Sequence, residues 1–294
     1  MTSSPPDADD TSSAHLGNLG RAEHGVGGQP AATAAAVPIA TGKPSPEVVQ
    51  QLREYLQADD SRLGEVYRGL QRSLTADQIA AELGVATSNF VWNYNQTIRA
   101  LLEGEVPSAP TVALGVARKF RALSKAKISS EVRAYLQASL TELESRANDE
   151  GARVVEVERL QEQTEEAEAL NEAGVYVYAL PHYLRYPFDP ATGRTLMKVG
   201  RSDSDVIVRF RNQTRTTALP EEPVLLRIYA TEAGGNADAE AAFHRLLVAA
   251  DHSRSVARSA GREWFVTSTR FTDEVARTMK LPIRVVNEAA VEDD

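Results

Sequence analysis

Hydrophobic residues recur at helical spacing through the first half of the chain. Val48, Leu52 and Leu56 stand four residues apart, which places their side chains on one face of a helix. Pro46, just before them, suits the first turn of a helix. Similar stripes return several times before the pattern changes. We therefore predict an all-α region over residues 46–147.

Within this region, residues 74–103 resemble a helix-turn-helix, in which the second helix enters the major groove of DNA. Gly84 supplies the left-handed position expected between the two helices. Asn89 and Asn93 lie near the start of the second helix, where base contacts are made. No cation occurs there before Arg99, although attraction to phosphate dominates affinity for DNA. Two interpretations stay open: DNA targeting, or packing in a helical bundle.

Three segments have compositions unlike those of the folded parts. Residues 1–45 are rich in Ser, Pro, Ala and Gly and predict a disordered tail. Residues 148–172 are strongly acidic and rich in helix formers, so we expect one exposed helix linking two parts of the chain. Its thin apolar seam is a candidate contact for a homodimer. Residues 289–294 form a short acidic tail.

The pattern after residue 173 changes to short runs of β-branched and aromatic residues separated by helical stretches. Residues 175–180, 195–199 and 224–230 are each typical of a strand. Helical patterns follow the second and third of them. The fold class predicted is α+β, with a small, mainly antiparallel sheet flanked by helices over residues 173–288.

The composition excludes several kinds of site and of protein. The chain of 294 residues has no cysteine, which excludes disulfides and zinc sites built on thiolates. No apolar stretch is long enough to span a bilayer, so we expect no membrane contact and a cytoplasmic location. The formal net charge is −9, yet residues 173–288 contain 16 Lys and Arg against 13 Asp and Glu. A polyanion is therefore expected to bind in the C-terminal part.

Five short motifs follow one another in this C-terminal part. They are Gly174-Val175-Tyr176, Lys198-Val199-Gly200, Arg209, Glu240 and Glu263-Trp264-Phe265. Their order resembles the GIY-YIG endonuclease superfamily, in the divergent phage-type branch whose second motif reads Lys-Ile-Gly followed by Arg. The resemblance covers about a third of the chain and implies the GIY-YIG fold and phosphodiester hydrolysis.

The resemblance implies a catalytic role for several residues. Tyr176 would orient or deprotonate the attacking water, helped by the charge of Lys198 and Arg209. Arg209 would also clamp the scissile phosphate. Glu240 would hold a single Mg²⁺ or Mn²⁺ ion, and His244, one helical turn later, would reach the metal or the phosphate.

Further residues are expected to contact DNA through phosphate. Arg201 directly follows the second motif, and Arg211 follows the expected catalytic arginine by two positions, so only one of that pair should face the site. Tyr178 shares a strand face with Tyr176 by alternation and competes with it for the catalytic role. His182 lies in the insert between the first two strands.

The hypothesis from sequence is a metal-dependent DNA endonuclease whose helical N-terminal half serves targeting or dimerisation. RNA remains an alternative substrate. The alternative from another class is a catalytically inactive nucleic-acid-binding or regulatory protein that retains the nuclease fold.

Overall fold

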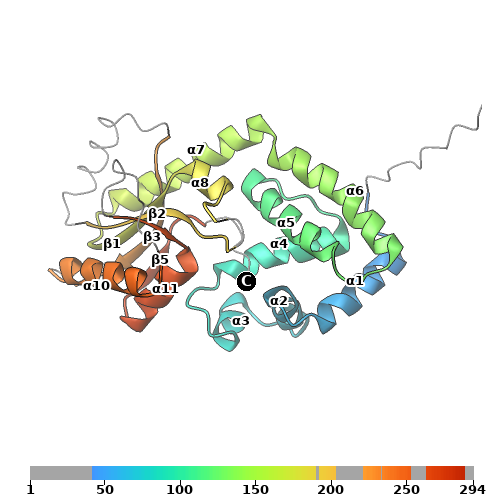
Figure 1. Cartoon of the computed structure of the whole chain (residues 1–294), viewed down its shortest axis with the longest axis horizontal. Coiled ribbons are helices and arrows are strands. Elements are labelled where there is room, and N and C mark those ends of the chain that lie inside the picture. The colour runs from blue at the N-terminus through green and yellow to red at the C-terminus, as the bar shows by residue number, and fades with distance from the viewer. Residues whose placement is uncertain (1–41, 190–191, 203–220, 233, 253–262, 289–294) are drawn as a thin grey trace, which may run out of the picture. The chain divides into compact units, whose positions relative to one another are not determined.

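A computed structural model describes residues 42–189, 192–202, 221–232, 234–252 and 263–288. Helices occupy the first half of this part of the chain, and a five-stranded sheet with helices occupies the second half (Figure 1). The α+β class predicted from the sequence is confirmed. Residues 1–41, the C-terminal tail over residues 289–294, Arg209 and Arg211 lie outside the described residues.

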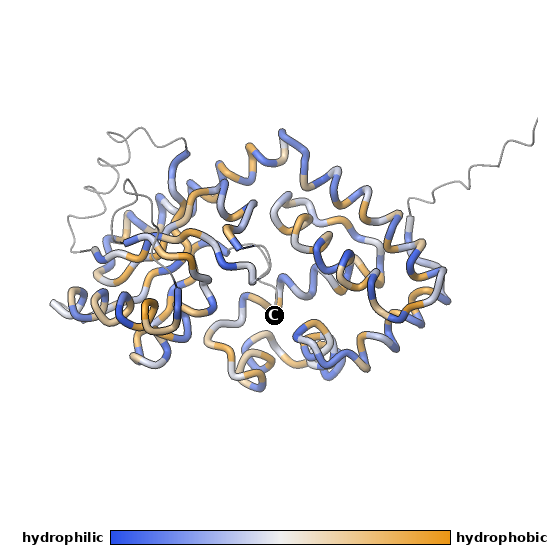
Figure 2. Tube along the Cα trace, in the orientation of Figure 1, coloured by the Kyte–Doolittle hydropathy of each residue, from blue (hydrophilic) through white to orange (hydrophobic). Residues whose placement is uncertain are grey.

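The N-terminal half is a bundle of helices around one apolar core. Leu52, Val66, Phe120 and Leu136 are fully buried in it. Figure 2 shows hydrophobic and hydrophilic residues alternating at short intervals along each helix, as amphipathic helices require. The helices are α1 (Pro46–Ala58), α2 (Arg62–Gln71), α3 (Ala76–Glu82), α4 (Asn89–Glu103), α5 (Pro110–Leu123) and α6 (Ser130–Ala147).

The helix-turn-helix-like segment consists of α3 and α4. Thr75 begins α3 with a capping box, since its hydroxyl accepts from the Gln78 amide at 3.2 Å and the Gln78 side chain accepts from the Thr75 amide at 2.8 Å. Gly84 between the helices has φ 65°, as expected for a left-handed turn. Asn93 in α4 is only 7% exposed and so is not presented for insertion into a groove, whereas Asn89 on the same helix is exposed.

The acidic segment forms a single helix, α7 (Glu150–Ala169), as expected. It differs from the expectation in exposure, because one face of its second half is buried. Its first half leaves Val154 and Val157 exposed, and they remain available as a seam. Its second half is packed against the sheet, where Thr164 is buried and accepts from the Leu225 amide at 3.0 Å. Neither α7 nor any other helix in the described part of the chain is long and apolar enough to cross a bilayer.

All strand pairs of the sheet are antiparallel, in the order β4-β2-β1-β3-β5. The strand at one edge, β5, was not expected from the sequence, because its three residues carry no alternating pattern. The strands are β1 (Gly174–Ala179), β2 (Thr195–Ser202), β3 (Val224–Ala230), β4 (Trp264–Thr267) and β5 (Ile283–Val285), with helices α8 (Pro181–Arg185), α10 (Asn236–Ala249) and α11 (Thr269–Thr278).

The two faces of the sheet are covered by different helices. Val175 and Val177 of β1 belong to a core that includes Phe243 of α10. Tyr176 and Tyr178 alternate with them, point to the other face and pack near α7. Helix α10 and the two tyrosine rings therefore lie on opposite sides of the central strand.

Gly174 begins β1 at a point where two strands approach closely. A Cβ atom at this position would collide with the carbonyl oxygen of Tyr229 on β3. The first glycine of the motif is therefore required by strand packing, independently of any catalytic role.

A buried histidine in the C-terminal half predicts that the stability of the fold decreases at acidic pH. His252 is 3% exposed, its Nδ1 lies 2.7 Å from the Thr267 hydroxyl, and burial, with the nearby charge of Arg194, lowers its pKa from 6.5 to about 4. Between pH 6.5 and about 4 the histidine binds a proton in the unfolded chain but not in the folded chain. The free energy of unfolding is therefore highest above pH 6.5 and decreases as the pH falls toward 4. We expect a loss of roughly 1–3 kcal/mol, measured by urea unfolding at about pH 7 and about pH 4.5. His252→Gln should show a smaller loss; an equal loss in both proteins would contradict this origin.

Candidate active site

A cluster of charged side chains lies beside β2, the strand that carries the second motif. Lys198 Nζ is 3.2 Å from Glu263 Oε2. The two residues are brought together by strand pairing, since the Val199 amide donates to the Glu263 carbonyl at 2.8 Å where β4 begins. Lys198 is largely covered, with 18% of its side chain exposed. The lysine is therefore held in place beside a carboxylate.

The second ion pair of the cluster joins β2 to α10. Arg201 Nε is 3.6 Å from Glu240 Oε2, and the Glu240 side chain is 17% exposed. Arg201 is paired in register with Val175, whose side chain points to the α10 face of the sheet. The Glu240 carboxylate consequently reaches the strand that carries the second motif.

His244 follows Glu240 by one helical turn and also reaches β2. Its Nε2 lies 2.8 Å from the carbonyl oxygen of Val199, and its ring packs against Phe265 with centroids 5.0 Å apart. If the Nε2 atom carries the proton, it donates to that carbonyl and leaves Nδ1 as the acceptor. The histidine thus anchors α10 to β2 within the cluster.

Charges around Glu240 act in both directions. Burial raises the pKa of its carboxyl above the ordinary value, while His244, Arg201 and Lys198 oppose that shift and Glu263 adds to it. A half-buried carboxylate beside a second carboxylate is stabilised by additional positive charge.

The family resemblance implies a divalent ion, for which Glu240 offers an oxygen ligand. Mg²⁺ binds carboxylate oxygens and keeps several waters, so one or two carboxylates can hold it. Glu240 fits that requirement as a single carboxylate, whereas Glu263 pairs with Lys198 on the other face of the sheet. Among the residues with described positions, no group of three or more His, Cys, Asp or Glu suited to a metal ion is found.

The two tyrosines of β1 lie apart from Glu240, on the sheet face that α7 covers. Their rings stack with centroids 6.2 Å apart. Tyr178 donates to Glu168 Oε1 of α7 at 3.0 Å, in a buried environment. Tyr176, 2% exposed, donates to the backbone carbonyl of Glu172. Lys198 pairs with Tyr178 in register and so emerges on the tyrosine face, which makes it the link between the tyrosines and the charged cluster.

Of the predicted site residues, the structure therefore brings together Arg201, Glu240 and His244 on the α10 face, whereas Lys198 emerges on the tyrosine face beside Glu263. His182 lies elsewhere, in α8, where its backbone amide donates to Glu221 at 2.8 Å. Arg209 and Arg211 are not among the described residues.

Glu263 is the member of the cluster to which the sequence assigned no role. It stands directly before Trp264 and belongs to the last of the five motifs. Its contact with Lys198 depends on the register between β2 and β4, which no local pattern specifies.

Comparisons with known proteins found no matching family model, no matching curated protein and no matching solved structure.

Proposed function

We propose that the protein is a metal-dependent endonuclease that hydrolyses phosphodiester bonds in DNA. The observation that carries the proposal is the pair of ion contacts on β2: Arg201 with the half-buried Glu240 on the α10 face, and Lys198 with Glu263 on the tyrosine face. The order of the five motifs in the sequence adds to it. RNA is the alternative substrate of the same chemistry.

The side chains of the cluster match the needs of phosphodiester hydrolysis. Water attacks phosphorus, the bond to the leaving oxygen breaks, and negative charge grows on the phosphoryl oxygens. Arg201 and Lys198 are held as cationic donors that can bind those oxygens. Glu240 would bind a single divalent ion, and such an ion, when bound, supplies positive charge to the leaving oxygen. Tyr176 is proposed to position the water, which requires its hydroxyl to leave the Glu172 carbonyl and to reach Glu240 from the opposite face of the sheet.

A basic cleft supports DNA as the partner. The residues before and at the start of α4, Thr87 to Asn89, line an open cleft of about 870 Å³. Arg277, Lys280 and Arg284, from α11 and the β5 region, line the same cleft together with Asp77. Arg277 pairs with Glu274 and Arg284 with Glu172, so phosphate would compete with these carboxylates for the two arginines. The cations that the helix-turn-helix-like segment lacks in its own sequence are thus supplied by the C-terminal half. Phosphate contacts there would position DNA without reading its sequence.

The alternative of an inactive nucleic-acid-binding protein is favoured by one observation. The Tyr176 hydroxyl is buried under the end of α7 and is already engaged with a backbone carbonyl. A protein that never releases this hydroxyl would bind DNA without positioning water through it.

The two tyrosines provide the test of the proposed role. We expect Tyr176→Phe to slow the nicking of supercoiled plasmid by about 10²-fold, because a positioned general base contributes about that much or more. Tyr178→Phe is the matched control, since it removes a hydroxyl from the same face and strand. Impairment by Tyr178→Phe alone would transfer the role to that residue. Equal, undiminished cutting by both variants would remove the phenol from the mechanism.

A further inference from the structure

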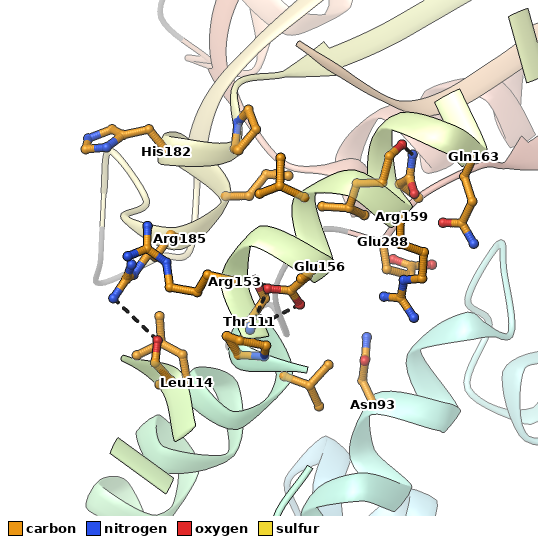
Figure 3. A pocket seen from close by; sticks show the side chains of 18 of the residues that line it. Asn93, Thr111, Leu114, Arg153, Glu156, Arg159, Gln163, His182, Arg185 and Glu288 are labelled. Carbon is orange, nitrogen blue, oxygen red and sulfur yellow. Dashed lines mark hydrogen bonds between the residues drawn. The ribbon is translucent and has the colours of Figure 1, made fainter. Parts of the chain in front are cut away.

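A polar cavity lies away from the cluster, where α4 and the start of α5 meet α7, α8 and residues 285–288 (Figure 3). Its volume is about 300 Å³. That size is at the lower end of the range in which proteins bind small molecules. None of the motifs that resemble the nuclease family contributes to its lining.

The Asn93 amide faces the cavity. Asn93 as a residue is 7% exposed, and its backbone carbonyl accepts from the Thr97 hydroxyl at 3.5 Å. In Figure 3 its side chain points away from α4 into the cavity, toward Arg159 and Glu288. No hydrogen bond of the amide to a residue in the described part of the chain is found, so both its donor and its acceptor are available to a ligand in the cavity.

The charges lining the cavity favour an anion. Its three carboxylates within the described part of the chain are already engaged: Glu156 accepts from the Thr111 hydroxyl at 2.8 Å, Glu221 accepts from the His182 amide at 2.8 Å, and Glu288 pairs with Arg227 at 3.1 Å. Arg153 pairs with the exposed Glu150. Arg159 has no ion-pair or hydrogen-bond partner among the residues described. Guanidinium groups that are not neutralised by the protein are available to bind phosphate.

Flat ring surfaces stand at the same cavity. Trp92, one position before Asn93, is 55% exposed, and Tyr186 of α8 is 52% exposed. Stacking on exposed aromatic rings is the usual way in which proteins hold an unpaired base. An asparagine amide offers a donor and an acceptor side by side, which matches the edge of a base.

We propose that this cavity binds one nucleotide, with its phosphate on Arg159 and Arg153, its base edge on the Asn93 amide and its base face on Trp92. The same chemistry belongs to a free mononucleotide and to a single nucleotide turned out of a strand. The site is independent of hydrolysis at Glu240, so it stands whether or not the protein cleaves DNA.

Quenching of tryptophan fluorescence in the full chain measures the binding, because Trp92 is one of only two tryptophans. The probes are 5′-mononucleotides with each of the four bases, inorganic phosphate, and a short single-stranded oligonucleotide. We expect at least one mononucleotide to quench saturably. Asn93→Leu and Arg159→Gln should each weaken binding by about tenfold or more. Asn95→Leu on the same helix and Arg133→Gln on α6 are the matched controls, since neither residue lines the cavity.

Thermal unfolding without ligand gives a second readout. Because the Asn93 amide makes no hydrogen bond within the described residues, Asn93→Leu should weaken binding without lowering the melting temperature. A lower melting temperature would show a structural partner for Asn93 and overturn the assignment. Competition between oligonucleotide and mononucleotide would indicate a nucleotide turned out of a strand, and mononucleotide binding alone a free nucleotide. The proposal fails if no nucleotide binds, if inorganic phosphate binds equally well, or if both variants bind like the wild type.

Discussion

Glu240→Gln is expected to lower the rate of DNA cleavage by roughly 10³-fold, because it removes the proposed oxygen ligand of the divalent ion, whose charge contributes several kcal/mol. Glutamine preserves the size of the side chain, so the contact between α10 and β2 through His244 should survive. Cleavage of supercoiled plasmid under single-turnover conditions measures the effect, with circular dichroism to show that the fold is intact.

Glu144→Gln serves as the matched control for this change. Glu144 is also a helical carboxylate paired with an arginine, at 2.6 Å from Arg121, but it lies in α6 outside both the cluster and the cleft. Its replacement should leave the cleavage rate unchanged. Equal activity of Glu240→Gln and the wild type would contradict a metal role for Glu240.

The second large effect concerns stability. Asp273→Asn is expected to lower the free energy of unfolding by roughly 3–5 kcal/mol, because it leaves a buried guanidinium without one of its two carboxylates. Arg227 Nε lies 3.2 Å from both oxygens of Asp273, and the two side chains are 2% and 4% exposed. Burial alone would lower the pKa of Arg227, but Glu288 and Asp273 raise it above the ordinary value, so the arginine stays charged.

Urea unfolding measures this loss, with Glu274→Gln as an exposed neighbour expected to change stability by less than about 0.5 kcal/mol. The double variant Arg227→Met with Asp273→Leu should lose less stability than Asp273→Leu alone, since it leaves no buried cation. A loss below about 1 kcal/mol for Asp273→Asn would show that water or rearrangement compensates the arginine.

Periodic hydrophobic patterns predicted those helices and strands whose buried face follows the pattern along the sequence. The stripe of Val48, Leu52 and Leu56 forms the buried face of α1, and the third predicted strand coincides with β3. By contrast, β5 has only three residues and no alternation, and its position depends on pairing with β3. Short edge strands are determined by tertiary contacts, which local sequence does not contain.

Two features of the sites could not be predicted from the sequence, because they also depend on tertiary contacts. Glu263 and Lys198 are 65 positions apart and meet only through the register of β4 on β2. Asn93 lies in a helix that packs on α1, α2, α3 and α5, and it is only 7% exposed, which no local pattern in α4 indicates. The acidic composition of α7 also suggested exposure on all sides, although a few small or short side chains, such as Thr164 and Ala167, suffice to pack it on the sheet.

Incubation of supercoiled plasmid with the purified wild-type protein tests the proposed nuclease most directly. With Mg²⁺ or Mn²⁺ we expect nicked or linear product, no product in the presence of a chelator, and none from Glu240→Gln purified in the same way. Plasmid that is bound by the wild type yet stays intact with either metal would contradict the proposed nuclease activity, and so would equal cutting by the wild type and Glu240→Gln.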